Sequence, residues 1–148
     1  MYPIVLNIHS ILAYVVFLLL MVSIIRWIVK INQNATYSDS DKKWSKIVVM
    51  VVHTQFLIGL VLYLFLSPIT QEAFSNVGEA MRNSALRFML LEHITANLLA
   101  VVAITMGSVK AKKVAGDKIK FKKLAFLFSI GFILLLSRVP WANWWNLN

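Results

Sequence analysis

The sequence predicts an all-α integral membrane protein, a bundle of four transmembrane helices with the N-terminus and the C-terminus on the outer side of the membrane. Of its 148 residues, 59% are hydrophobic and only 14% are charged, whereas ordinary soluble domains carry about 25% charged residues. The apolar residues form four long runs, and most basic residues lie in two of the loops between them. This composition argues against a soluble domain.

The four apolar runs define the expected spans. Roughly 20 apolar residues in a helix cross the hydrocarbon core of a bilayer. The runs lie at about residues 4–25, 47–66, 86–106 and 124–139. Pro68 ends the second run, because its ring cannot continue the helical hydrogen-bond ladder, and residues 71–84 are expected to form a short interfacial helix. Since the sequence shows no repeat and no long linker, we expect residues 1–148 to form a single transmembrane domain.

The basic residues indicate the orientation of the spans. Twelve of the fifteen flank the loops after the first and third runs: Arg26, Lys30, Lys42, Lys43, Lys46, Lys110, Lys112, Lys113, Lys118, Lys120, Lys122 and Lys123. Basic loops stay on the cytoplasmic side of a membrane, so we expect both loops inside and both termini outside. Their charge is expected to meet the anionic headgroups of membrane lipid, and no nucleic-acid partner is expected.

The tryptophans agree with this orientation. Trp27 and Trp44 fall at the cytoplasmic boundary. Trp141, Trp144 and Trp145 fall at the outer boundary. Aromatic side chains form belts at both membrane interfaces, so we expect these five residues to lie there.

The sequence excludes several kinds of chemistry. It contains no cysteine, which rules out disulfide frameworks, thiolate zinc sites, iron–sulfur clusters and covalent c-type haem attachment. It shows no nucleophile–base arrangement, no phosphate-binding loop and no hydrolytic motif. We therefore expect no self-contained catalysis, and these absences leave open whether the chain is an enzyme.

Ionisable side chains inside the apolar runs are few, and such residues face the bundle interior or pair with one another. They are His9, His53, Glu92, His93 and Arg138, and they include all three histidines. Measured from the basic ends of their runs at about 1.5 Å per residue, His9, His93 and Arg138 lie about 22–25 Å deep. His53 lies only about 10 Å deep, in the inner half of the membrane.

His9 and His93 therefore form a pair of imidazoles at matching depth on two spans. Facing helices of a four-helix bundle hold cofactors with such residues, and an iron between two imidazoles needs both ligands at one height. We expect these histidines to be the axial ligands of one b-type haem in the outer half of the membrane. Arg87 and Arg138 are expected to pair with its propionates, and Asn97 to hydrogen-bond a ligand or a water.

Two further ionisable residues, Glu92 and His53, are expected to have roles other than axial ligation. Glu92 points about 100° away from His93 around a helix, so it either pairs with Arg138 or accepts the hydrogen bond that orients a ligating histidine. His53 is expected to form an interhelical hydrogen bond or to belong to a quinone pocket. Space for the macrocycle is expected beside three small residues, Ala96, Ala100 and Gly131.

Four segments carry a family resemblance: LNIHS, VVHTQFLIGLVLYLFLSP, LRFMLLEHITANLLAVVAITMGSVKAKK and SRVPW. They resemble small four-span bacterial membrane proteins of the cytochrome b-like kind, over essentially the whole chain and including the placement of the three histidines. The resemblance implies a b-type haem, an electron-transfer role and a multi-pass protein of the bacterial inner membrane. Larger b-type cytochromes with two haems carry four ligating histidines, so three imply at most one bis-histidine haem.

Three interpretations stay open. The first is a single-haem cytochrome b that exchanges electrons with quinol, as a homodimer or with other respiratory membrane subunits. The second is a non-haem metal site or transporter on His9, His93 and Glu92, whose nitrogen and oxygen donors suit zinc, copper or iron. The third is a non-catalytic subunit or assembly factor whose polar residues only join helices. The residues favour the first interpretation.

Overall fold

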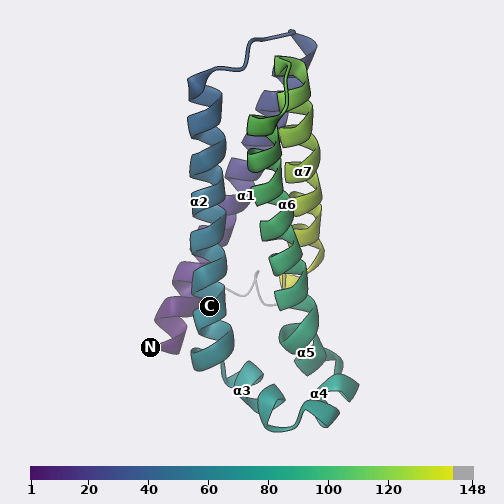
Figure 1. Ribbon diagram of the computed structural model, residues 1–148. Coiled ribbons are helices and arrows are strands. Elements are labelled where there is room, and N and C mark those ends of the chain that lie inside the picture. The colour runs from purple at the N-terminus through teal and green to yellow at the C-terminus, as the bar shows by residue number, and fades with distance from the viewer. Residues whose placement is uncertain (142–148) are drawn as a thin grey trace.

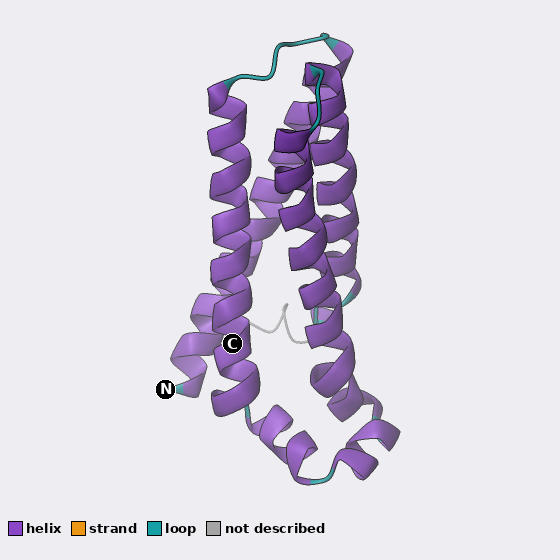
Figure 2. Ribbon diagram, in the orientation of Figure 1, coloured by secondary structure: helices purple, strands orange, loops and turns teal. Residues whose placement is uncertain are grey.

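The structure, a computed structural model, describes residues 1–141, and nearly all of them are helical (Figure 1, Figure 2). The elements are α1 (Tyr2–Asn32), α2 (Asp39–Val61), η1 (Leu62–Leu66), α3 (Pro68–Ser75), α4 (Val77–Arg82), α5 (Ser84–Arg87), η2 (Phe88–Glu92), α6 (His93–Lys113) and α7 (Asp117–Ser137). Both η segments are π-helices. No strand occurs in residues 1–141. The prediction of an all-α fold is confirmed.

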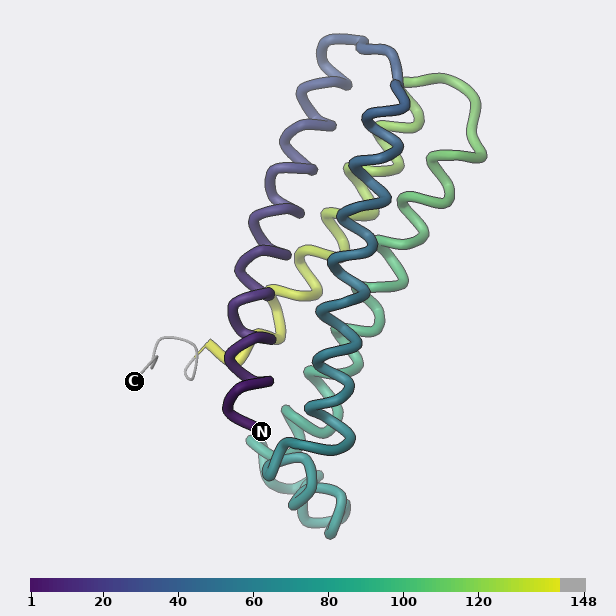
Figure 3. Tube along the Cα trace, turned by 90° about the vertical axis from the view of Figure 1, so that its left-hand side faces the viewer, coloured from purple at the N-terminus to yellow at the C-terminus, as the bar shows by residue number. Residues whose placement is uncertain are grey.

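The long helices run side by side, each antiparallel to the next along the chain (Figure 3). Three helical segments are long and apolar enough to cross a membrane: Tyr2–Asn32, Asp39–Leu66 and Ser84–Lys113. They contain the first three expected spans. In α7, lysines occupy the first turns, and the apolar part at 124–137 extends only about 21 Å, less than the roughly 30 Å of a hydrocarbon core. The fourth span therefore stays a prediction.

The second span ends where the sequence predicts. Ser67 caps α3 by accepting a hydrogen bond from the backbone N of Thr70, and Pro68 occupies the first turn of α3. Proline fits that position because its missing N–H would have no helical partner there. The expected interfacial helix is divided among α3, α4 and α5 (Figure 1).

The two ends of the bundle differ in charge. We call the end formed by loops 33–38 and 114–116 and their flanking helix turns the basic end. It holds the twelve basic residues named above together with Asp39, Asp41 and Asp117. The opposite end, with α3 to α5, holds Arg82, Arg87, Arg138, Glu72, Glu79 and Glu92. The formal net charge of +9 therefore lies at the basic end.

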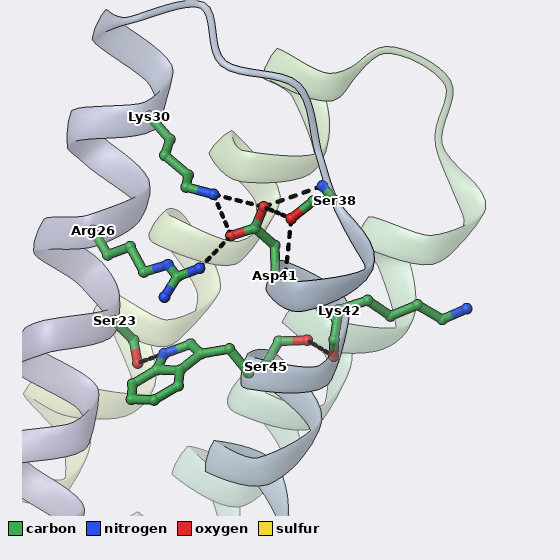
Figure 4. A network of polar contacts seen from close by, with 8 residues as sticks. Ser23, Arg26, Lys30, Ser38, Asp41, Lys42 and Ser45 are labelled. Atoms are coloured by element: carbon green, nitrogen blue, oxygen red, sulfur yellow. Dashed lines mark hydrogen bonds and ion pairs between the residues drawn. The ribbon is translucent and has the colours of Figure 1, made fainter.

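Asp41 joins α1 to α2 at the basic end (Figure 4). Its fully buried carboxylate accepts hydrogen bonds from Nζ of Lys30 at 2.5 and 2.7 Å and from Nη2 of Arg26 at 2.9 Å. Ser38 donates to this carboxylate from Oγ at 2.8 Å and from its backbone N at 3.1 Å. The backbone N of Asp41 donates in return to Oγ of Ser38 at 3.3 Å, which completes a capping box. A buried carboxylate is stable only when it is paired and hydrogen-bonded, so this cluster holds the start of α2 against α1.

The tryptophans depart in part from the expected belts. Trp27 is completely buried and packs edge-on against Phe128 of α7, with ring centroids 4.6 Å apart. Its assignment to a lipid-facing belt is wrong, because its face of α1 packs against α7. Trp44 is half-buried and donates from Nε1 to Oγ of Ser23 at 2.8 Å. Trp141, at the opposite end of the bundle, is 41% exposed, and the last two belt positions, 144 and 145, lie outside the described residues.

The small residues expected beside a macrocycle serve helix packing instead. A Cβ at Gly131 would clash with the side chain of Ile104 and lie 3.1 Å from the carbonyl O of Ala100. Ala96 and Ala100 are buried. The expectation that these residues leave space for a cofactor is therefore wrong, because small residues here let α6 and α7 approach closely.

The Asp41→Asn variant tests the cluster at the basic end. Removing the buried charge leaves Arg26 and Lys30 without their carboxylate, and we expect a loss of about 2 kcal/mol in the free energy of unfolding. Denaturation in detergent, followed by circular dichroism, measures the change. Asp39→Asn is the matched control, because Asp39 is exposed. Equal stability of the two variants would contradict this role of Asp41.

Candidate functional site

A cavity of about 140 Å³ lies among α1, α2, α6 and the end of α7, toward the α3–α5 end of the bundle. Most of its lining is apolar. Its polar side chains include His9, Gln55, Tyr63, Thr70, His93 and Asn97. An apolar cavity of about 150 Å³ can hold one benzene ring, so the volume is that of a single aromatic ring.

His9 reaches this cavity from α1 and lies against α2. A Cβ at Gly59 would lie 2.8 Å from Cε1 of His9, so only glycine leaves space for the imidazole there. Gln55 donates from Nε2 to the carbonyl O of His9 at 2.9 Å, and the same amide nitrogen lies 3.4 Å from Nε2 of the ring. The buried Nδ1 of His9 has no hydrogen-bond partner among the described residues. Four other buried side-chain atoms of residues 1–141 also lack a partner, among them Oε1 of the neighbouring Gln55, and such an atom is a position where a water, an ion or a ligand can bind.

His93 begins α6, and its ring is held by the chain beyond α7. Its Nδ1 lies 2.7 Å from the carbonyl O of Arg138, so it carries the proton and donates it to that oxygen. A neutral imidazole protonated at Nδ1 has its lone pair at Nε2, which is the form that binds a metal ion. Asn97, one turn further along α6, donates from Nδ2 to the carbonyl O of His93 at 2.6 Å. The backbone therefore fixes the tautomer of His93.

Glu92 is the carboxylate of a small ion cluster beside His93. Its Oε1 accepts from Nε of Arg87 at 3.1 Å, and its Oε2 lies 3.4 Å from Nε of Arg138. Arg138 thus meets Glu92 through its side chain and His93 through its carbonyl. Both arginines that were expected to meet propionates already share this carboxylate, and the cluster retains one net positive charge.

His53 does not line the cavity. Its Nε2 lies 2.9 Å from Oγ1 of Thr105 on α6. Thr105 donates its own hydroxyl proton to the carbonyl O of Val101 at 2.7 Å, so His53 is the donor in the first contact. His53 therefore joins α2 to α6, separately from the other two histidines.

Two π-helical segments lie beside the cavity and contact each other. The hydroxyl of Tyr63, in η1, donates to the carbonyl O of Leu90, in η2, at 2.8 Å. Thr70 in turn donates from Oγ1 to the carbonyl O of Tyr63 at 2.8 Å. Single π-turns inside α-helices occur frequently at functional sites. Their contact at this position links the α3–α5 end to the wall of the cavity.

Sequence reasoning missed three residues of the site: Gln55, Gly59 and Tyr63. The sequence does offer a signal for Gln55, because it is a polar side chain inside an apolar run. Gln55 lies two positions from His53 and thus about 200° around the same helix, so the two side chains face different neighbours. Gly59 and Tyr63 give no such signal, since their roles depend on the neighbouring helices.

The chain matches no known protein family, no curated protein and no solved structure in the comparisons. Within residues 1–141, no group of three or more His, Asp or Glu side chains is arranged to hold a metal ion. The geometry therefore gives no support to a mononuclear site built from His9, His93 and Glu92 together.

Gly59→Ala tests the contact between α2 and His9. The added methyl group must displace the imidazole, so we expect the ring NMR signals of His9 to shift while those of His53 stay unchanged. Overpacking of this kind costs about 1–3 kcal/mol. The control is Gly78→Ala on α4, where the nearest atom would lie 3.7 Å from the new Cβ. Unchanged His9 signals would contradict the arrangement.

Proposed function

We propose that this chain is a membrane electron-transfer protein that binds one b-type haem through His9 and His93 and exchanges electrons with quinol. One observation carries the proposal: two histidines 84 positions apart in sequence line the same cavity inside an apolar helical bundle. The third histidine is bound to a neighbouring helix instead. The cofactor would supply one-electron chemistry, and the chain would hold and insulate it.

The donor set fits a haem iron. His9 has a buried ring nitrogen with no partner among residues 1–141. His93 is held by the Arg138 carbonyl in the tautomer that leaves Nε2 free for a ligand. Metal-bound histidines usually donate their other ring proton to such a carbonyl or carboxylate. The cavity volume of about 140 Å³ is smaller than a macrocycle requires, so haem binding requires the lining of the cavity to open.

The ion cluster supports the placement of an anionic cofactor. Arg87 and Arg138 meet a single carboxylate, Glu92, and all three side chains are partly exposed. An incoming carboxylate can therefore replace Glu92 on either arginine without burying an unpaired charge. We assign propionate binding to these arginines, and we assign the orientation of ligands or water to Asn97 on the cavity lining.

The charge distribution supports the membrane arrangement within the proposal. With twelve of the fifteen basic residues at the basic end and three at the other, we propose four spans in a cytoplasmic membrane, with both termini outside. The cavity then lies in the outer half of the membrane. Quinol dissolved in the bilayer reaches that depth directly, and respiratory subunits or a second copy would be the electron partners.

A reduced-minus-oxidised absorption spectrum of the detergent-purified protein, expressed with ample haem, tests the proposal. We expect a sharp b-type α-band and one haem per chain. His9→Ala and His93→Ala should each abolish tight haem binding, because each removes an axial ligand. His53→Ala is the matched control and should retain the full haem content.

Three results would overturn the proposal. Full haem content in both variants would show that these histidines are not the ligands. A colourless protein with one metal ion per chain would establish the non-haem metal site. A colourless, metal-free protein that assembles normally after both histidines are replaced would establish the non-catalytic subunit or assembly factor.

The size of the cavity favours a second candidate, direct binding of a quinone ring without haem. A volume of about 140 Å³ holds one aromatic ring, and Gln55 and the unpartnered Nδ1 of His9 can hydrogen-bond its carbonyl oxygens. Titration of the colourless protein with a water-soluble benzoquinone, followed by histidine NMR signals, distinguishes this candidate. Saturable shifts of the His9 and His93 signals would establish it, and unshifted signals would exclude it.

A further inference from the structure

A second hollow, of about 620 Å³, lies between the end of α1 and the first turns of α7. We call it the α1–α7 groove. It is lined by Ile31, Ile119, Lys122, Lys123, Ala125, Phe126 and Ser129. It lies at the basic end and shares no residue with the histidine cavity, so it does not depend on haem binding and rests only on the membrane arrangement proposed above.

The two lysines of the groove have no ionic partner within residues 1–141. Asp41 is bound by Arg26 and Lys30, and Asp117 lies 3.4 Å from Nζ of Lys120. Lys122 and Lys123 are adjacent, exposed and without a neighbouring carboxylate. The mouth of the groove therefore presents two positive charges that an anion can neutralise.

The remainder of the groove is apolar. Ala125, Phe126 and Ser129 follow the lysines along α7 and lie about 3–10 Å further from the basic end. Phe126 is 65% exposed. In the membrane arrangement proposed above, the two lysines lie on the headgroup side of the groove and the exposed aromatic ring lies on the acyl-chain side. A free phosphate ion would contact only the first of these features.

We propose that the α1–α7 groove binds one anionic phospholipid, with its phosphate at Lys122 and Lys123 and an acyl chain along Phe126. Basic pockets between transmembrane helices on the cytoplasmic side bind anionic headgroups in this manner. The phosphate neutralises the two lysines, and the acyl chain covers the aromatic ring. A zwitterionic lipid fits less well, because its own cation opposes the lysines.

Native mass spectrometry of the delipidated chain with added dioleoyl phosphatidylglycerol tests this site. Two basic residues near a membrane surface together change the affinity for anionic lipid about thirtyfold, so the Lys122→Gln/Lys123→Gln variant should bind about thirtyfold more weakly. Lys112→Gln/Lys113→Gln is the matched control, because this adjacent exposed pair at the end of α6 lies outside the groove. It should bind as the unmodified chain does, and circular dichroism verifies that both variants fold.

Phe126→Ala separates a lipid from a free phosphate. The variant should weaken phosphatidylglycerol binding, and inorganic phosphate should not compete with the lipid. Equal weakening by both lysine pairs would overturn the site in favour of general surface charge. Equal affinity for dioleoyl phosphatidylcholine, or full competition by inorganic phosphate, would overturn the choice of ligand.

Discussion

The buried carboxylate of Asp41 sets the register of α1 against α2, and the position of the cavity depends on that register. The first contacts are those of Asp41 with Arg26 and Lys30. Three residues further along each helix, Trp44 donates to Ser23. His9 then meets Gly59, 17 residues from Arg26 and 18 residues from Asp41. At about 1.5 Å per residue, the separation of His9 from Arg26 along α1 and that of Gly59 from Asp41 along α2 agree to within one residue. One antiparallel register of the two helices therefore extends from the basic end to the cavity.

In a hydrocarbon environment a polar side chain needs a partner inside the protein. His53 has Thr105 as its partner, and Glu92 has two arginines. In the cavity, the neighbouring side chains of His9 and Gln55 each keep one buried atom without a partner among the described residues, Nδ1 of His9 and Oε1 of Gln55. Three further atoms of this kind belong to Arg26, Trp27 and Tyr37, outside the cavity. The candidate site is therefore located by the lining of the cavity, which brings His9, Gln55 and His93 together.

Much of the architecture could be predicted from composition and from helical rise. The apolar runs locate the first three long helices and Pro68 marks the end of the second, although each helix extends seven or eight residues beyond its run at the basic end. Residue counting predicts His9 and His93 at one depth and His53 at another. Depth along a helix depends only on the sequence of that helix. Rotation about its axis depends on neighbouring helices, which is why Trp27, expected at the lipid surface, lies in the core.

The same limit applies to the candidate site. Gly131 was expected to provide space for a cofactor, but the side chain of Ile104 fills that space. Gly59, on another helix, makes room for His9 instead. The side chain that a glycine faces is determined by the register between two helices. This register cannot be read from the sequence of either helix alone. The π-helical segments and the contact between Tyr63 and Leu90 depend on tertiary packing in the same way.

The central claim is that His9 and His93 hold the same ligand from two helices. Low-temperature electron paramagnetic resonance of the oxidised protein, prepared with ¹⁵N-labelled histidine, tests it most directly. The account predicts a low-spin ferric signal coupled to two imidazole nitrogens. A high-spin ferric signal, or coupling to a single imidazole, would show that the two histidines do not share one iron.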